Sequence, residues 1–313
     1  MISRKEAVIQ SAVAALFSGG LYSLSLVVPA GMAAALFCPL PLALLAWRGT
    51  AANAALMAVM SAALISFFAP AEAIAYFAQF GLGAFIIGYG VKKGWTPEKT
   101  IGGFAAISCF ATLLLLAVLA NSASQPPGEF IAAVAGEWKA QIGKTFSEEL
   151  SEISADEVAL FQERLESAAA FVVRSFPGIL AALSLMVGWA NTMLLRSVLK
   201  KREEVLTDWR LMRLPANLIW VLIASGALTA LGEGELRDAG INILIPVATV
   251  YFFQGIAIVH FLFETRKTPR LISWPVYAII ILNMPVAPIM VAALGAFDLW
   301  ADFRSRIVPP AVN

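Results

Sequence analysis

The chain has 313 residues and a formal net charge of +1, and 60% of its residues are hydrophobic while 14% are charged. Ordinary soluble domains contain about 45–50% apolar and about 25% charged residues. The composition therefore excludes an ordinary soluble domain and favours a protein that lies in a lipid bilayer. The near-neutral charge gives no basis for binding nucleic acid, and we expect no nucleic-acid partner.

Catalytic and metal-binding patterns are missing from the sequence. His260 is the only histidine, and no CxxC, HxxxH or HExxH pattern of a zinc site occurs. No GxSxG pattern occurs either, and nearly all polar residues inside the apolar segments are neutral amides. We therefore expect no metal, no cofactor and no enzymatic activity.

Apolar segments follow one another along the chain, most of them near the length of about 20 residues that crosses the hydrocarbon core. Arg4 and Lys5 precede the first segment. Its apolar run is longer than the core of about 7–15 residues in a signal peptide, so we expect a retained first helix. The nine segments cover approximately residues 7–28, 31–46, 51–69, 72–91, 100–120, 171–195, 214–231, 239–263 and 272–298.

Prolines mark two of these segments as irregular. Pro39 and Pro41 interrupt the second segment, which predicts a broken or tilted helix. The ninth segment contains Pro275, Pro285 and Pro288, so it either crosses the membrane with a kink or doubles back. The sequence therefore predicts an all-α fold, a polytopic transmembrane helix bundle with eight or nine membrane segments.

Basic residues predict the orientation, because lysine and arginine are enriched on the cytoplasmic side of membrane proteins. With the N-terminus inside, the cytoplasmic segments hold 15 of the 22 basic residues and the outer segments hold five. We therefore expect a multi-pass protein of the inner (cytoplasmic) membrane with a cytoplasmic N-terminus. Arg304 and Arg306 lie in the C-terminal tail, which nine full crossings would place outside. Either the ninth segment doubles back, or two arginines are tolerated outside.

Two polar stretches interrupt the apolar pattern. Residues 121–170 are predicted outside, where Ser154 followed by Glu157 forms a capping-box pattern that starts a helix. Three apolar residues of the first half recur at every fourth position and share one helical face: Phe130, Val134 and Trp138. We expect two amphipathic helices that act as a solvated cover, or as a lid or docking surface. Residues 196–213 form a basic, amphipathic, cytoplasmic linker that meets anionic lipid headgroups or a cytoplasmic partner.

Small residues occupy every fourth position of the first segment and therefore form one smooth helical face: Ala7, Ser11, Ala15, Gly19 and Ser23. Without bulky side chains, a second helix can approach such a face closely. This face is predicted to pack either within the chain's own bundle or against a membrane protein partner.

Polar side chains are costly inside the membrane, so each of them is a functional candidate. Glycines of the fourth segment leave room for a ligand or for a closely packed helix. A candidate cavity for a small hydrophilic solute is therefore formed by Asn53, Gln79, Gly81, Gly83, Asn191 and Gln254. The alternative is that the amides hold helices together and the glycines only permit close packing.

Short patterns in residues 7–195 resemble the YybS-like family of bacterial polytopic membrane proteins. They are the small-residue first helix, the Pro39-Leu40-Pro41 element, Arg48-Gly49, and the glycines that precede Lys92-Lys93. The resemblance continues through Trp209-Arg210, Leu214-Pro215, Gln254-Gly255, Leu294-Gly295, Asp298 and Asp302-Phe303-Arg304.

That family is distantly similar to the substrate-binding S-components of energy-coupling-factor vitamin transporters. The resemblance implies a six-helix bundle in residues 1–195, whose small-residue first helix contacts a coupling subunit. Residues 214–313 and the outer insertion depart from that pattern, and the former are expected to be a C-terminal transmembrane extension. The implied function is binding or transport of a small molecule of unassigned identity. The alternative is a non-transporting scaffold that holds other membrane proteins.

Overall fold

The computed structural model describes residues 4–27, 31–49, 51–146, 154–200, 212–283 and 286–307. Within these ranges the chain forms helices and no strand, which confirms the predicted all-α fold class. Five helices are long and apolar enough to cross a membrane: Val8–Val27, Pro70–Lys92, Pro97–Ser122, Phe176–Leu199 and Gly234–Thr265. Five further apolar helices are shorter: Ala33–Arg48, Asn53–Ser66, Leu218–Leu231, Arg270–Ile280 and Val286–Ala301.

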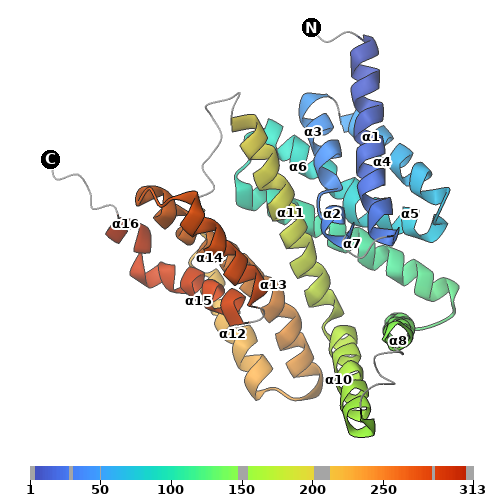
Figure 1. Ribbon diagram of the computed structural model, residues 1–313, viewed down its shortest axis with the longest axis vertical. Helices are drawn as coiled ribbons and strands as arrows, with labels where there is room; N and C mark the ends of the chain where they lie inside the picture. Colours follow the sequence, from blue (N-terminus) through green and yellow to red (C-terminus); the bar gives the residue numbers. More distant parts are fainter. Residues whose placement is uncertain are drawn as a thin grey trace.

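Eight helices and one π-helical turn build an N-terminal bundle (Figure 1). They are α1 (Arg4–Val27), α2 (Met32–Ala35), α3 (Pro39–Arg48), α4 (Ala51–Ser66), α5 (Pro70–Tyr76), the π turn η2 (Phe77–Gly81), α6 (Leu82–Lys92), α7 (Pro97–Ser122) and α11 (Phe176–Lys200). A single apolar core joins them, with Leu42, Tyr76 and Phe104 almost fully buried. The helices therefore enclose one continuous interior.

Prolines set several helix boundaries in this bundle. Pro39, Pro70 and Pro97 each lie in the first turn of a helix, where the missing N–H group has no helical partner to lose. A turn over residues 36–38 separates α2 from α3. The second apolar segment is therefore broken, as the prolines predict.

The described residues of the insertion form two helices, α8 (Pro127–Thr145) and α10 (Ala155–Arg174), at the end of the molecule opposite the start of α1 (Figure 1). The Ser154–Glu157 capping box is present, as predicted. Lys139 of α8 forms an ion pair with Glu166 of α10 at 3.3 Å. On the predicted apolar face of α8, Val134 and Trp138 are about half exposed and Phe130 is partly buried, so the insertion covers this face only in part.

Five helices follow the linker: α12 (Leu218–Leu231), α13 (Gly234–Thr265), α14 (Arg270–Leu282), α15 (Val286–Ala301) and α16 (Phe303–Ile307). The described part of residues 196–213 is the end of α11 and the extended segment that starts at Met212. α13 joins this region to the bundle by packing on α11, where the rings of Trp189 and Phe253 stack at 5.1 Å.

The ninth apolar segment is divided into α14 and α15, because the helix ends near Asn283. An α-helix rises about 1.5 Å per residue, so the two helices measure about 20 Å and about 24 Å. The hydrocarbon core is about 30 Å thick. Neither helix crosses it alone, and the segment is not one kinked spanning helix.

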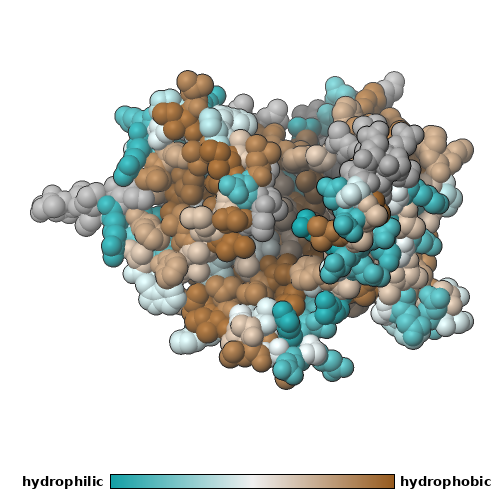
Figure 2. Space-filling model, turned by 60° about the horizontal axis from the view of Figure 1, so that its bottom comes forward, coloured by the Kyte–Doolittle hydropathy of each residue, from teal (hydrophilic) through white to brown (hydrophobic). Residues whose placement is uncertain are grey.

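Apolar side chains cover much of the surface, most densely over the C-terminal helices, while hydrophilic side chains gather over the insertion (Figure 2). The apolar residues with large exposed fractions in the C-terminal helices include Trp220, Leu231, Leu271, Trp274 and Leu282. An exposed apolar surface of this extent is unusual for a soluble monomer and fits contact with lipid.

Candidate functional site

The small-residue face of α1 is turned partly toward α4. Ala15 and Gly19 are buried, and Ser61 of α4 donates a hydrogen bond from Oγ to the Ala15 carbonyl oxygen at 3.0 Å. A Cβ atom at Gly19 would lie 3.3 Å from the Ser61 carbonyl oxygen. Ser11 and Ser23 are half-buried. The central part of the face therefore packs inside the chain.

Ala7 belongs to α1, but its side chain lies outside the described set. The opposite side of α1 is exposed and apolar, and it includes Val13, Leu16 and Phe17. This side, and not the small-residue face at Ala15 and Gly19, is the part of α1 that lipid or another protein can reach.

A buried hydroxyl network near α1 was not predicted. Ser18 donates from Oγ to the Cys38 carbonyl oxygen at 2.6 Å and lies 2.5 Å from Tyr76 Oη. Tyr22, one turn later, donates to Glu72 Oε2 at 2.6 Å. The network connects α1 to the α2–α3 turn and to α5. Serine and tyrosine inside an apolar segment are the sequence signal that could have revealed it.

The glycines of the candidate cavity lie at helix contacts. A Cβ atom at Gly83 would lie 2.5 Å from the Phe104 ring, and one at Gly81 would lie 3.1 Å from the Phe77 ring. Gln79 is half-buried in η2. Gly83 allows α6 to approach α7 closely, whereas Gly81 lies against Phe77 of its own π turn and Ala58 of α4. The space that the missing side chains leave is filled by these neighbours.

The three remaining cavity candidates lie apart from one another. Asn53 is exposed on α4. Asn191 is buried on α11 and donates from Nδ2 to the carbonyl oxygens of Leu36 and Val187, at 2.7 and 2.8 Å. Gln254 is buried on α13, in the C-terminal region. The structure therefore does not bring the six candidates into one cavity.

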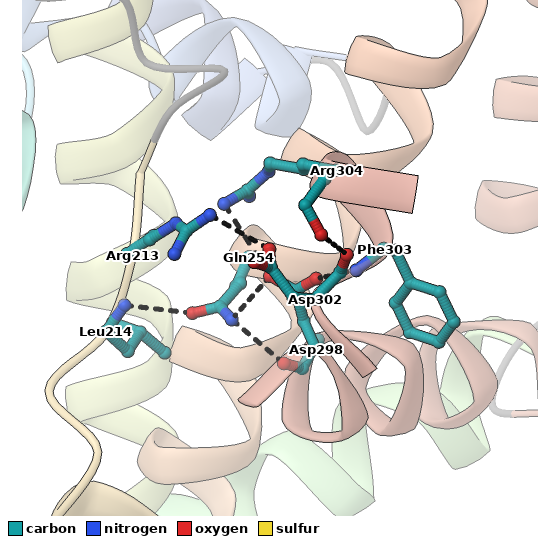
Figure 3. Close-up of polar contacts among 9 residues, drawn as sticks. Arg213, Leu214, Gln254, Asp298, Asp302, Phe303 and Arg304 are labelled. Atoms are coloured by element: carbon teal, nitrogen blue, oxygen red, sulfur yellow. Dashed lines mark hydrogen bonds and ion pairs between the residues drawn. The ribbon is translucent and has the colours of Figure 1, made fainter. Parts of the chain in front are cut away.

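Gln254 belongs to a polar cluster that the sequence analysis had not assembled (Figure 3). Its Oε1 accepts a hydrogen bond from the Leu214 backbone N–H at 3.0 Å. Its Nε2 donates to the Gly295 carbonyl oxygen at 3.0 Å and to Asp298 Oδ2 at 3.4 Å. A single side chain thereby connects the segment before α12 to α13 and α15.

Asp298 and Arg304 form the buried centre of this cluster, each with its side chain 4% exposed. Asp298 Oδ2 lies 3.6 Å from Arg304 Nη1, and Asp298 Oδ1 accepts from the Phe303 backbone N–H at 3.0 Å. Nε, Nη1 and Nη2 of Arg304 have no hydrogen-bond partner in the part of the chain that the structure describes. Burial lowers the pKa of the Arg304 guanidinium, and the Asp298 carboxylate opposes that shift.

An ion pair at the exposed edge completes the arrangement. Arg213 Nη2 donates to Asp302 Oδ1 at 2.9 Å, and the two side chains are 62% and 45% exposed. Asp302 has a φ of +39°, at the turn between α15 and α16. Together these residues form the Arg304 cluster, which consists of Arg213, Leu214, Gln254, Asp298, Asp302 and Arg304.

Two glycines make this convergence sterically feasible. A Cβ atom at Gly255 would lie 1.9 Å from the Val291 carbonyl oxygen, and one at Gly295 would lie 2.1 Å from the Tyr251 carbonyl oxygen. α13 and α15 can cross at this distance only because both positions lack a side chain. The close crossing brings Gln254 to Asp298.

The pockets on the described surface include two with an apolar lining and one with a charged lining. An apolar pocket of 320 Å³ lies between α11, α13, α14 and α15, and another of 370 Å³ lies between α1 and α3. The third, of 660 Å³, lies at the junction of α13 and α14 and has a mixed, charged lining. None of the six cavity candidates lines any of the three. Within the described ranges no three His, Cys, Asp or Glu side chains are placed to hold a metal ion.

A family model described as a predicted membrane protein, DUF2232, matches residues 13–299. The chain belongs to the DUF2232 family. That match spans the bundle, the insertion and most of the C-terminal helices, and together with the five apolar spans it makes the chain a multi-pass membrane protein. No curated protein and no solved structure is found to match the chain.

Proposed function

We propose that this chain is a membrane-embedded, transport-related binding protein for a small hydrophilic solute, and that an anionic group of that solute binds at the Arg304 cluster. The supporting observation is the buried Arg304 guanidinium, whose nitrogens lack hydrogen-bond partners within the described ranges. A buried unpaired donor costs about 1–3 kcal/mol, and more when it is charged. A carboxylate or phosphate oxygen of a solute would satisfy these donors.

Access to Arg304 would come from the edge of the cluster. Arg213 and Asp302 are both partly exposed, and their ion pair lies beside the buried Arg304–Asp298 pair. Exposed ion pairs contribute only about 0–1 kcal/mol of stability, so separating Arg213 from Asp302 requires little free energy. On this proposal the protein binds its solute without changing it covalently and is not an enzyme.

The architecture supports an S-component-like and YybS-like interpretation of residues 1–195. Six helical segments, made by α1, α2–α3, α4, α5–α6, α7 and α11, surround one apolar core. Residues 214–313 and the insertion at 121–170 would be additions to that pattern. The Arg304 cluster would then be a feature of the added region.

We also propose that the chain lies in the inner (cytoplasmic) membrane with its N-terminus inside. Basic residues of several segments gather near the first half of α1. Arg48 Nη1 lies 3.4 Å from Gln10 Oε1, and Lys92 Nζ donates to the Gly49 carbonyl oxygen at 2.7 Å. The positive-inside rule places such a cluster in the cytoplasm.

The proposal is tested on gently extracted protein by native mass spectrometry and by thermal melting with a panel of small carboxylates and phosphate esters. We expect at least one anionic compound to co-purify or to raise the melting temperature, since a ligand at about 100 times its dissociation constant stabilises by about 2.7 kcal/mol. Arg304→Gln should abolish the effect, and Arg213→Gln at the exposed edge should weaken it without unfolding the protein. A panel without any response, or a response that persists in both variants, would overturn the assignment.

The alternative is a scaffold that binds other membrane proteins, and one observation favours it. The 370 Å³ groove between α1 and α3 is lined mainly by apolar residues, including Val13, Phe17 and Leu44, and borders the exposed side of α1. Because Gly19 faces α4, replacing it would disturb the chain's own fold. Phe17 is the informative position.

The scaffold is tested by purification from native membranes with Val13→Ala/Phe17→Ala and with Phe68→Ala, which changes an exposed phenylalanine on the turn after α4. The scaffold predicts an identified membrane protein that is lost from the double variant and retained with Phe68→Ala. Equal recovery from both variants would contradict a role for the groove.

A further inference from the structure

The 660 Å³ pocket at the junction of α13 and α14 combines charged, hydroxyl and aromatic side chains. α13 ends at Thr265 and α14 begins at Arg270, so the pocket lies between the last turn of one helix and the first turn of the next. Its polar lining includes His260, Glu264, Lys267, Arg270, Ser273 and Tyr277. It lies apart from the Arg304 cluster, with which it shares no lining residue.

The pocket lining holds one carboxylate, that of Glu264, and two cationic side chains, those of Lys267 and Arg270. Glu264 Oε1 lies 3.6 Å from His260 Nε2, and His260 Nδ1 lies 3.0 Å from Tyr277 Oη. The side chains of Lys267 and Arg270, in contrast, form no ion pair with any residue of the described ranges. With His260 neutral, the lining therefore has a positive formal charge, and its two cationic side chains lie in the same pocket as the Tyr277 hydroxyl.

The start of α14 adds a further preference for negative charge. The N–H groups of the first turn of a helix lack helical acceptors and carry the positive end of the helix dipole. Arg270 and Ser273, both in that first turn, line the pocket. An anion held there would meet both cationic side chains and the helix end, which is the arrangement that suits phosphate.

The surface next to the pocket is apolar and exposed. Leu271 is 87% exposed, Trp274 is 71% exposed, and Ile272 is 55% exposed on the same first turns of α14. Tryptophan is enriched where membrane meets water. A site for a freely soluble anion has no need of such neighbours, but the acyl chains of a lipid would cover them.

We propose that this pocket binds the phosphate of an anionic phospholipid, with Lys267 and Arg270 pairing with the phosphate and the acyl chains lying along Leu271 and Trp274. Tyr277 is then placed to donate a hydrogen bond to the headgroup, and the His260–Glu264 pair forms the opposite wall. This inference does not depend on the solute proposed for the Arg304 cluster.

The test is native mass spectrometry of the full chain, released from detergent after incubation with phosphatidylglycerol, phosphatidylcholine, glycerol phosphate or inorganic phosphate. We expect phosphatidylglycerol to be retained at least tenfold better than phosphatidylcholine, and the two soluble phosphates not to be retained. Lys267→Gln/Arg270→Gln should weaken phosphatidylglycerol binding about thirtyfold, since each basic residue near an anionic membrane surface contributes about 1 kcal/mol. Arg266→Gln, which changes the residue next to Lys267 outside the pocket, should leave binding unchanged.

Tyr277→Phe keeps the edge-to-face contact with Phe263, whose ring centroid lies 5.8 Å away, and removes only the hydroxyl group. It should fold normally and lose severalfold in phosphatidylglycerol binding. Equal retention of the two lipids, or equal losses in Arg266→Gln and in the double variant, would overturn the proposal. Retention of glycerol phosphate as strong as that of phosphatidylglycerol would assign the pocket to a soluble phosphate and overturn the lipid assignment.

Discussion

The N-terminal bundle and the C-terminal helices solve the problem of packing inside a membrane in different ways. In the bundle, neutral hydroxyls such as those of Ser18 and Ser61 donate to backbone carbonyl oxygens between apolar side chains. The bundle also buries one arginine, Arg196, which donates to the Trp95 carbonyl oxygen. In the C-terminal region, the buried Asp298–Arg304 pair lies at the crossing of α13 and α15. Neutral hydrogen bonds hold helices at low cost, whereas a buried charge pair is costly to enclose. Arg196 donates to a backbone carbonyl oxygen, whereas Nε, Nη1 and Nη2 of Arg304 have no hydrogen-bond partner within the described ranges, so the functional proposal is placed in the C-terminal region.

Breaking the charge pair should have the largest effect. Asp298→Ala removes the counter-charge of Arg304 and an acceptor for Gln254 and for the Phe303 N–H. Removing one partner of a buried pair typically costs about 3–5 kcal/mol, so we expect a large fall in melting temperature in detergent. Asp298→Leu/Arg304→Met, which removes both charges, should be more stable than Asp298→Ala. If the single and double variants have the same melting temperature, the buried ion pair is not what distinguishes the two regions.

Replacing a glycine at a close helix contact by alanine should lower the free energy of unfolding by a smaller amount. The loss should be similar in the two regions. A Cβ atom at Gly88 would lie 2.2 Å from the Ala43 carbonyl oxygen, and one at Gly295 would be equally close to the Tyr251 carbonyl oxygen. Gly88→Ala and Gly295→Ala should each destabilise by about 1–3 kcal/mol, measured by thermal melting. Gly20→Ala is the control, because nothing lies within 4 Å of its Cβ position. A loss in the control as large as in the other two would refute the packing explanation.

Removing the two neutral hydrogen bonds of one buried serine in the bundle should have a smaller effect than breaking the charge pair. Ser18→Ala leaves the Cys38 carbonyl oxygen and Tyr76 Oη without their shared partner. A net loss of about 1 kcal/mol is expected for such a bond. Ser66→Ala should be nearly neutral, because Ser66 Oγ is exposed and donates within its own helix. A loss above that of Asp298→Ala would reverse the contrast between the regions.

The smallest effect concerns the insertion, outside both regions. Hydrogen bonds from the Ser154 side chain and backbone lower the pKa of Glu157 below its ordinary value of 4.5. The stabilisation of the start of α10 is therefore present above the unfolded pKa and is lost as pH falls through the folded pKa. Hydrogen exchange in the first turn of α10, corrected for its intrinsic pH dependence, should show weaker protection as pH drops from 6 to about 3. Glu157→Gln should remove this change, whereas Glu163→Gln in the same helix should keep it.

The sequence reveals what depends on local composition and period. Apolar runs predict the all-α membrane fold, Pro39 predicts the broken second segment, and Ser154 with Glu157 predicts the start of α10. These features need only neighbouring residues, so they can be derived without knowing the fold.

Contacts between distant segments could not be derived in this way. Gln254 is 40 residues from Leu214 and 44 residues from Asp298, and no period along the chain indicates that the three meet. The contact of Gly19 with α4 could not be predicted either, because a face of small residues does not indicate which helix packs on it. The six cavity candidates were grouped by residue type, and type does not determine position in space.

The π turn η2 has a consequence for the segment that contains it. In an uninterrupted α-helix, residues seven apart differ by only about 20° around the axis, so Tyr76 and Gly83 would point to the same neighbour. Instead, Tyr76 contacts Ser18 of α1, while Gly83 packs on Phe104 of α7. The wider turn shifts the angular phase of α6 relative to α5. The continuous segment α5–η2–α6 can thereby pack against α1 on one side and against α7 on another.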